Sequence, residues 1–154
     1  MVRYLITGLP VILLCLLLQA VFVGKCLHYY ANFRAAHQAP ASQLTNISLL
    51  GTVMLLTLLG NFLQMAIWAG LFRLLGEFDD YSTALYHSCV NFATLGYGDI
   101  VMSERWRILG PMEASVGILM FGVSTAVMTA TIMDIMQRAR ARLDAASKDQ
   151  PGAR

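Results

Sequence analysis

The fold is decided by TLGYGD, residues 94–99, which joins a short apolar segment, 81–93, to a long one, 108–136. A helix of about 13 residues is too short to cross a membrane, whereas about 20 residues suffice. Irregular backbone between membrane segments is tolerated only where protein buries it or where it lines a water-filled path. We therefore predict that 81–93 is a re-entrant helix and that 94–99 is an irregular loop whose polar backbone is buried in protein or lines a water-filled path.

The loop contains two glycines at alternate positions, Gly96 and Gly98. Glycine adopts positive φ without a steric penalty, which lets successive carbonyl groups point to one side of the chain. Such carbonyls, together with the Thr94 hydroxyl, can replace the water shell of a dehydrated cation when several copies surround an axis. The Tyr97 ring can then brace the loop from outside.

The composition around this loop is that of a membrane protein, with 57% hydrophobic and only 13% charged residues. Residues 1–24 form an N-terminal transmembrane helix in this interpretation, since 5–24 carry no charge. A cleaved signal peptide is the rival interpretation, but its apolar core would span only about 7 to 15 residues. The fold class predicted is all-α, with three transmembrane helices and the re-entrant helix and loop between the second and third.

The remaining boundaries follow from changes in polarity along the chain. Residues 25–46 are too polar to span and are predicted to be a cytoplasmic loop with some interfacial helix around Tyr29. The pore domain expected over 47–136 begins with an outer helix, 47–75, in which Asn61 and Gln64 face protein rather than lipid. Residues 137–154 are expected to be a polar cytoplasmic tail.

From 84 through the third span the sequence resembles the pore module of potassium channels, whose filter reads Thr-Val-Gly-Tyr-Gly. Here Leu95 stands for the valine, and with the second span the resemblance covers about 47–136. It implies a homotetramer with an ion-binding filter, and K⁺ as the only cofactor. The filter residues are Thr94, Leu95, Gly96, Tyr97 and Gly98, of which Thr94 to Tyr97 hold the ion.

The resemblance also implies residues that support the filter, and here the sequence departs from the family. Val90 stands where some members have a buried glutamate, and Tyr86 and His87 stand where many have two tryptophans. Both side chains can donate hydrogen bonds to Asp99 and Tyr97. Trp106 is expected in the outer turn. Glu113 has no counterpart in the family; if buried it needs a partner, and Arg105 or Arg107 is nearest in sequence.

Candidate gating residues lie on the third span. Gly117 is either a hinge or a site of close packing against the re-entrant helix, and both readings are open at this point. Gly122 is a second candidate, where inner helices could approach one another. Asp134 is a candidate for a cation-concentrating ring at the inner mouth, although Arg138 follows at i+4 and can pair with it.

A filter of this family faces the outside, which puts the N-terminus outside and the C-terminus in the cytoplasm, in the plasma or inner membrane. The distribution of Lys and Arg agrees with that orientation. Membrane lipid is an expected partner, and a separate regulatory protein is one candidate for opening the pore. A net charge of +2 does not favour nucleic acid.

Two rival functions are considered: one differs from a potassium channel in its selectivity, and the other belongs to a different class of protein. A weakly selective cation channel would lack Tyr97 or the glycine spacing, which are both present. A non-conducting membrane adaptor would use the pore fold only for assembly. An enzyme is not expected, because no nucleophile with a base, paired carboxylates or metal-ligand cluster occurs at useful spacing.

Overall fold

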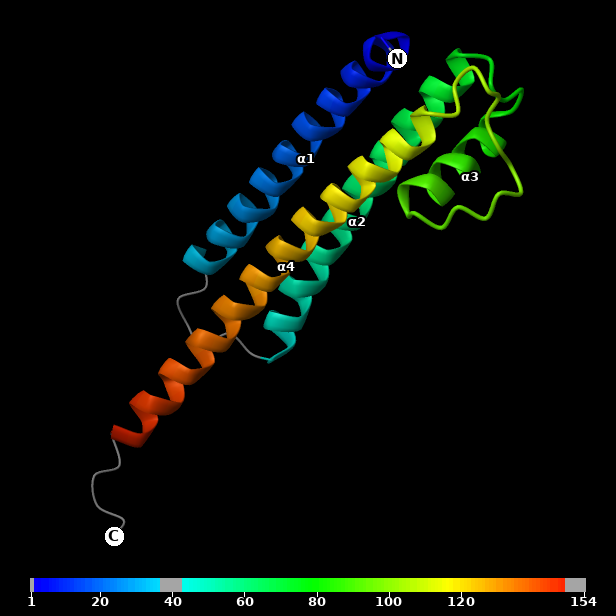
Figure 1. The fold of residues 1–154 in the computed structure, drawn as a ribbon. Helices are drawn as coiled ribbons and strands as arrows, with labels where there is room; N and C mark the ends of the chain where they lie inside the picture. Colours follow the sequence, from blue (N-terminus) through cyan, green and yellow to red (C-terminus); the bar gives the residue numbers. More distant parts are fainter. Residues whose placement is uncertain (1, 37–42, 149–154) are drawn as a thin grey trace.

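The computed structural model describes residues 2–36 and 43–148, and there the chain forms four helices joined by irregular segments (Figure 1). The helices are α1 (Val2–Ala36), α2 (Gln43–Leu74), α3 (Tyr81–Phe92) and α4 (Leu109–Lys148). The three long helices lie side by side, with α1 and α4 parallel and α2 antiparallel to both, while α3 lies beside the end of α2. The predicted all-α class is confirmed.

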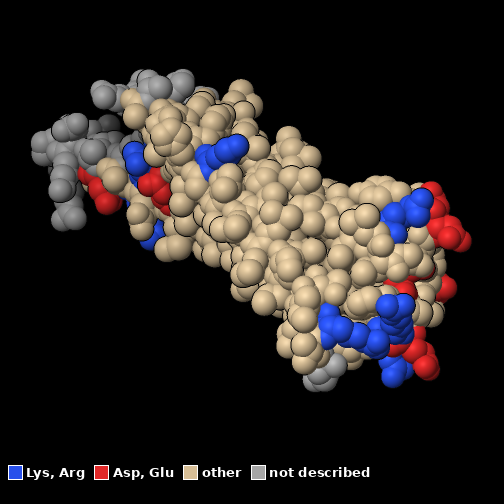
Figure 2. Space-filling view, turned by 90° about the horizontal axis from the view of Figure 1, so that it is seen from above, with Lys and Arg blue, Asp and Glu red and all other residues tan. Residues whose placement is uncertain are grey.

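Three of these helices are long and apolar enough to cross a membrane, over Val2–Ala35, Leu44–Leu74 and Leu109–Ala141. Charged side chains gather toward the two ends of the face in Figure 2 and leave its middle uncharged. An uncharged band between two charged ends is what a hydrocarbon layer requires of a protein surface. The chain is therefore a multi-pass membrane protein.

The first and last helices are longer than the sequence suggested. Helix α1 continues through Ala36, so the loop predicted over 25–46 is wrong at its N-terminal side. Residues 37–42 lie outside the described part. Helix α4 continues to Lys148, so most of the expected tail is helix. Both extensions lack glycine and proline, which allows a helix to continue once neighbouring turns have formed.

Local hydrogen bonds define both ends of the short helix α3. The Asp80 carboxylate caps the helix by accepting a hydrogen bond of 3.0 Å from the Thr83 amide. At the other end the Thr94 amide donates to the Asn91 carbonyl over 2.8 Å. The helix thus stops immediately before the loop at 94–99, within one residue of the prediction.

Helix α4 packs against the C-terminal end of α3 at Gly117. A β-carbon at Gly117 would lie 2.0 Å from the Phe92 carbonyl oxygen, which no side chain can do. Close packing is thus the role that the structure supports for Gly117. A β-carbon at Gly122 would meet nothing within 4 Å, so Gly122 is not a packing contact within one chain.

Helix α1 is joined to the other helices by side chains at three levels. Near the N-terminus of α1, Tyr4 meets Trp106 edge-on, with ring centroids 6.0 Å apart. In the middle, Gln64 Nε2 donates to Gln19 Oε1 over 2.8 Å, and Gln19 Nε2 contacts Ser124 Oγ at 3.4 Å. Gln64 therefore bonds to a neighbouring helix, as predicted, and Asn61 is also buried. The third level is the contact of Tyr30 and Arg34 with Asp134 on α4.

Candidate functional site

The loop at 94–99 has an alternating backbone. Thr94, Gly96 and Gly98 have φ of 59°, 57° and 75°, and Thr94 is the one non-glycine residue with positive φ in the described part of the chain. A β-branched residue in that region is a conformational outlier and persists only where its surroundings enforce it. The alternation is the backbone form that turns successive carbonyls toward one side. Leu95 and Tyr97 are exposed in the single chain.

The C-terminal end of the loop is bonded to α3 through Tyr86. Its hydroxyl donates to Asp99 Oδ2 over 2.6 Å, a bond the sequence predicted, and Asp99 Oδ1 accepts from the Ile100 amide at 3.0 Å. The hydrogen bond from Tyr86 is the main reason that the pKa of Asp99 is lowered. The same bond raises the pKa of Tyr86.

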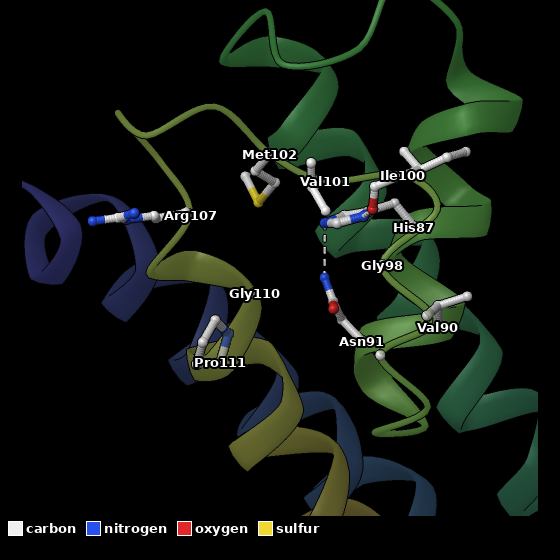
Figure 3. Close-up of a pocket in the computed structure, with 11 residues that line it drawn as sticks. His87, Val90, Asn91, Gly98, Ile100, Val101, Met102, Arg107, Gly110 and Pro111 are labelled. Atoms are coloured by element: carbon white, nitrogen blue, oxygen red, sulfur yellow. Dashed lines mark hydrogen bonds between the residues drawn. The ribbon is translucent and has the colours of Figure 1, made fainter.

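His87 forms a second tie from α3, to a different residue from those expected. Its Nδ1 lies 3.0 Å from the Ile100 carbonyl oxygen, and its Nε2 lies 2.8 Å from the Asn91 amide nitrogen (Figure 3). The prediction that His87 bonds to Asp99 or Tyr97 is therefore wrong about the partner. The Phe72 and Phe78 rings cover the imidazole, with centroids 5.6 and 4.9 Å away. This burial lowers the pKa of His87.

Glu113 is fully buried and meets no arginine among the described contacts. Its carboxyl group bonds to the Ser88 hydroxyl, which also contacts the Met65 carbonyl oxygen at 2.8 Å. The expectation that Arg105 or Arg107 would pair with Glu113 is wrong, because α4 turns this side chain toward α3. Ser88 thus connects α2, α3 and α4 behind the loop.

A pocket of about 360 Å³ lies behind the loop, between α3, the start of α4 and the connecting segment. Figure 3 shows His87 and Asn91 on one side of it, and Gly110 and Pro111 of α4 on the other. The sequence analysis missed Asn91, although its spacing of four from His87 places both on one face of a helix.

Trp106 and Asp134 both contact α1. Trp106 lies in the segment between the loop and α4 and is buried against the Tyr4 ring of α1. Asp134 pairs with Arg138 at 2.8 Å and lies 3.8 Å from Arg34, and the Tyr30 hydroxyl donates to the same carboxylate. The pairing with Arg138, the alternative to a cation ring, is present.

Three helices long and apolar enough to cross a membrane hold the short helix and the irregular loop between the second and third of them. A family model described as "Ion channel" matches residues 62–134, from the middle of α2 through the loop to α4. This segment, slightly less than half of the chain, is therefore similar to that ion-channel family, which supports an ion channel as the class of this protein. Comparison with curated proteins and with solved structures gave no match. Helix α1 lies outside the matched segment.

Proposed function

We propose that the chain is one subunit of a potassium-selective channel that conducts K⁺ passively through a tetrameric pore. The observation that carries the proposal is the alternation of positive φ at Thr94, Gly96 and Gly98 within a TLGYGD sequence. Carbonyls directed to one side can coordinate a dehydrated cation without formal charge. The ions would bind at Thr94, Leu95, Gly96 and Tyr97, with the Thr94 hydroxyl contributing at the inner end.

One chain supplies one such row of oxygens, and a closed ring of identical subunits is the common way to surround an axis. Helix α4 leaves a face of small and hydroxyl side chains exposed in the single chain, which suits approach by other copies or contact with a water-filled cavity. Its members are Gly122, Thr125, Ala126 and Thr129. The family resemblance sets the number of subunits at four.

The proposed orientation puts the loop and the N-terminus outside and the C-terminal end of α4 in the cytoplasm. Arg138, Arg140 and Arg142 then lie on the inner side, in agreement with the excess of basic residues on cytoplasmic segments. The same orientation places Asp134 near the inner mouth, where its bonds to Tyr30 and Arg138 hold it.

Ion flux into liposomes tests the proposal. The purified chain should pass K⁺ in preference to Na⁺, and Tyr97→Ala should lose the preference, because the loop loses the ring that braces it. Tyr29→Ala is the matched control, since Tyr29 is a similarly exposed tyrosine on α1. Light scattering of the detergent-solubilised protein should give the mass of four chains.

Each other outcome selects a different function. Equal passage of K⁺ and Na⁺ by the unaltered chain would indicate a weakly selective cation channel. Absence of flux from a well-folded tetramer would support the non-conducting adaptor.

A further inference from the structure

Asn91 and His87 meet behind the loop in an arrangement that fixes which nitrogen of the imidazole carries hydrogen. A carbonyl oxygen can only accept, so the bond to the Ile100 carbonyl places a hydrogen on Nδ1 of His87. The atom of Asn91 that faces Nε2 is the amide nitrogen, at 2.8 Å, which can only donate. Nε2 therefore carries no hydrogen, and His87 is the neutral Nδ1–H form.

The amide of Asn91 can keep this orientation only while Nε2 accepts a hydrogen bond. If the amide turned over, its oxygen would face Nε2, and a bond would then require hydrogens on both ring nitrogens, which is the charged imidazolium. The neutral imidazole and the observed orientation of Asn91 therefore require each other.

The packing around Asn91 restricts the same rotation. A β-carbon on Gly110 would lie 3.2 Å from the Asn91 amide nitrogen, which is closer than most real contacts of that kind. The side chain is therefore seated against the backbone of α4, in the region that Figure 3 shows beside the pocket. Asn91 thus lies on α3, packs against α4, and acts on the segment after the loop through its bond to His87.

We infer that Asn91 is a positioning residue for the filter, which acts by holding His87 as the neutral Nδ1–H tautomer that binds the Ile100 carbonyl. This inference rests on the proposed function, since it takes residues 94–98 as the filter. Ile100 follows Asp99 directly, so the bond fixes the outer end of the loop independently of the Tyr86 bond to Asp99.

The charged groups around His87 determine how acid affects it. Glu77 after α2 and Asp99 at the end of the loop act on it through space, Glu113 of α4 bonds to the neighbouring Ser88, and Arg107 lines the same pocket. Burial outweighs the two nearby carboxylates and lowers the pKa of His87 below 6.5. Protonation of His87 would put a hydrogen on Nε2 that faces the hydrogens of the Asn91 amide. Acid therefore breaks the hydrogen bond between Asn91 and His87.

Nitrogen-15 NMR of the protein labelled at histidine tests the tautomer without any measurement of flux. The signal of His87 is assigned by its absence from His87→Gln. At pH 7 it should show one protonated nitrogen, Nδ1, and in Asn91→Asp the Nε2–H or charged form should become more populated. A charged or Nε2–H imidazole at pH 7 in the unaltered chain would overturn the inference.

Potassium flux as a function of pH tests the effect on the filter. Flux should fall as the solution is acidified below pH 6.5, with the midpoint at the pKa of His87. Asn91→Asp provides a carboxylate that accepts from Nε2–H, so the midpoint should rise by roughly 1 pH unit or more.

The matched control is His28 on α1, which makes a bond of 2.9 Å with Asn32 at the same spacing of four but on an exposed surface. Asn32→Asp should leave the midpoint unchanged. Identical midpoints in the unaltered chain and in Asn91→Asp would overturn the inference. If no protein conducts at any pH, the proposed function fails, and the NMR result alone decides whether Asn91 sets the tautomer.

Discussion

The two ends of α4 are held in different ways. Its N-terminal end, which the proposed orientation makes the outer end, packs on α3 through buried contacts, with Gly117 against the Phe92 backbone and Glu113 bonded to Ser88. Its C-terminal end, the inner end in that orientation, lies away from α2 and α3, where Asp134 bonds to Tyr30 and Arg34 of α1. The outer contacts fix the geometry behind the loop, whereas the inner ones lie near the surface.

This difference indicates which part of α4 can move at a small cost in free energy. A backbone packed on backbone has one good arrangement, because cores are close-packed and resist small displacements. A half-exposed ion pair typically contributes only about 1 kcal/mol or less, so it can open and re-form. We therefore expect the outer half of α4 to move with α3 and the inner half to move relative to α1.

The largest expected effect is that of Gly117→Ala. The added methyl group would lie 2.0 Å from the Phe92 carbonyl oxygen, so α3 and α4 must separate. Overpacking of this kind should lower the free energy of unfolding by about 3 kcal/mol. Thermal unfolding in detergent measures it. Gly122→Ala is the control, because nothing lies within 4 Å of that position, and an equal loss there would refute the difference between the two glycines.

Ser88→Ala should have the next largest effect. It removes the hydroxyl that joins Glu113 of α4 to the Met65 carbonyl of α2, and leaves a buried carboxyl group with one partner fewer. A buried polar group deprived of its partner costs about 1 to 3 kcal/mol. The same unfolding measurement applies, with the exposed Ser115→Ala on α4 as control. Equal stability of the two variants would mean that this bond contributes nothing.

At the inner end, Asp134→Asn should lower stability by about 1 kcal/mol or less, since the ion pairs with Arg34 and Arg138 are partly exposed. High salt should reduce the difference from the unaltered chain. Asp144→Asn, farther along α4, serves as control for loss of one negative charge. A loss as large as that of Ser88→Ala would contradict the proposed contrast between the two ends.

The smallest effect expected is a dependence of stability on pH through His87. Its pKa is lower in the folded chain than in the unfolded one, because burial disfavours the charged form. Its contribution is therefore complete above pH 6.5 and is lost as the pH falls through the folded pKa. Between pH 7 and pH 5 the unaltered chain should lose more stability than His87→Gln. Parallel curves for the two proteins would exclude this contribution.

Local sequence was enough for some of these features and not for others. The helix ending before Thr94, its Asp80 cap and the bond from Tyr86 to Asp99 follow from spacing and from side-chain chemistry along one segment. The partner of Glu113 could not be found this way, because Ser88 reaches it only after α3 has folded back against α4. Sequence proximity to Arg105 and Arg107 was misleading for the same reason.

Two further differences have physical causes of the same kind. Gly117 could be a hinge or a packing site in the sequence, and only the position of the Phe92 carbonyl distinguishes them. The polar residues after 24 suggested a loop, but Tyr30 and Arg34 find a partner on α4 that permits a continuous helix. In both cases a contact between helices determines the local structure, which the composition of the segment alone does not.

The contact of Trp106 with α1 gives this protein a built-in optical reporter. The chain has two tryptophans, and Trp68 is buried in α2 whereas Trp106 meets the Tyr4 ring and lies 5.8 Å below the Arg3 guanidinium. A Trp68→Phe variant would carry a single indole at the outer end of α1. Its fluorescence would then follow the attachment of α1, a helix outside the matched family segment, while ions are added or the pH is changed.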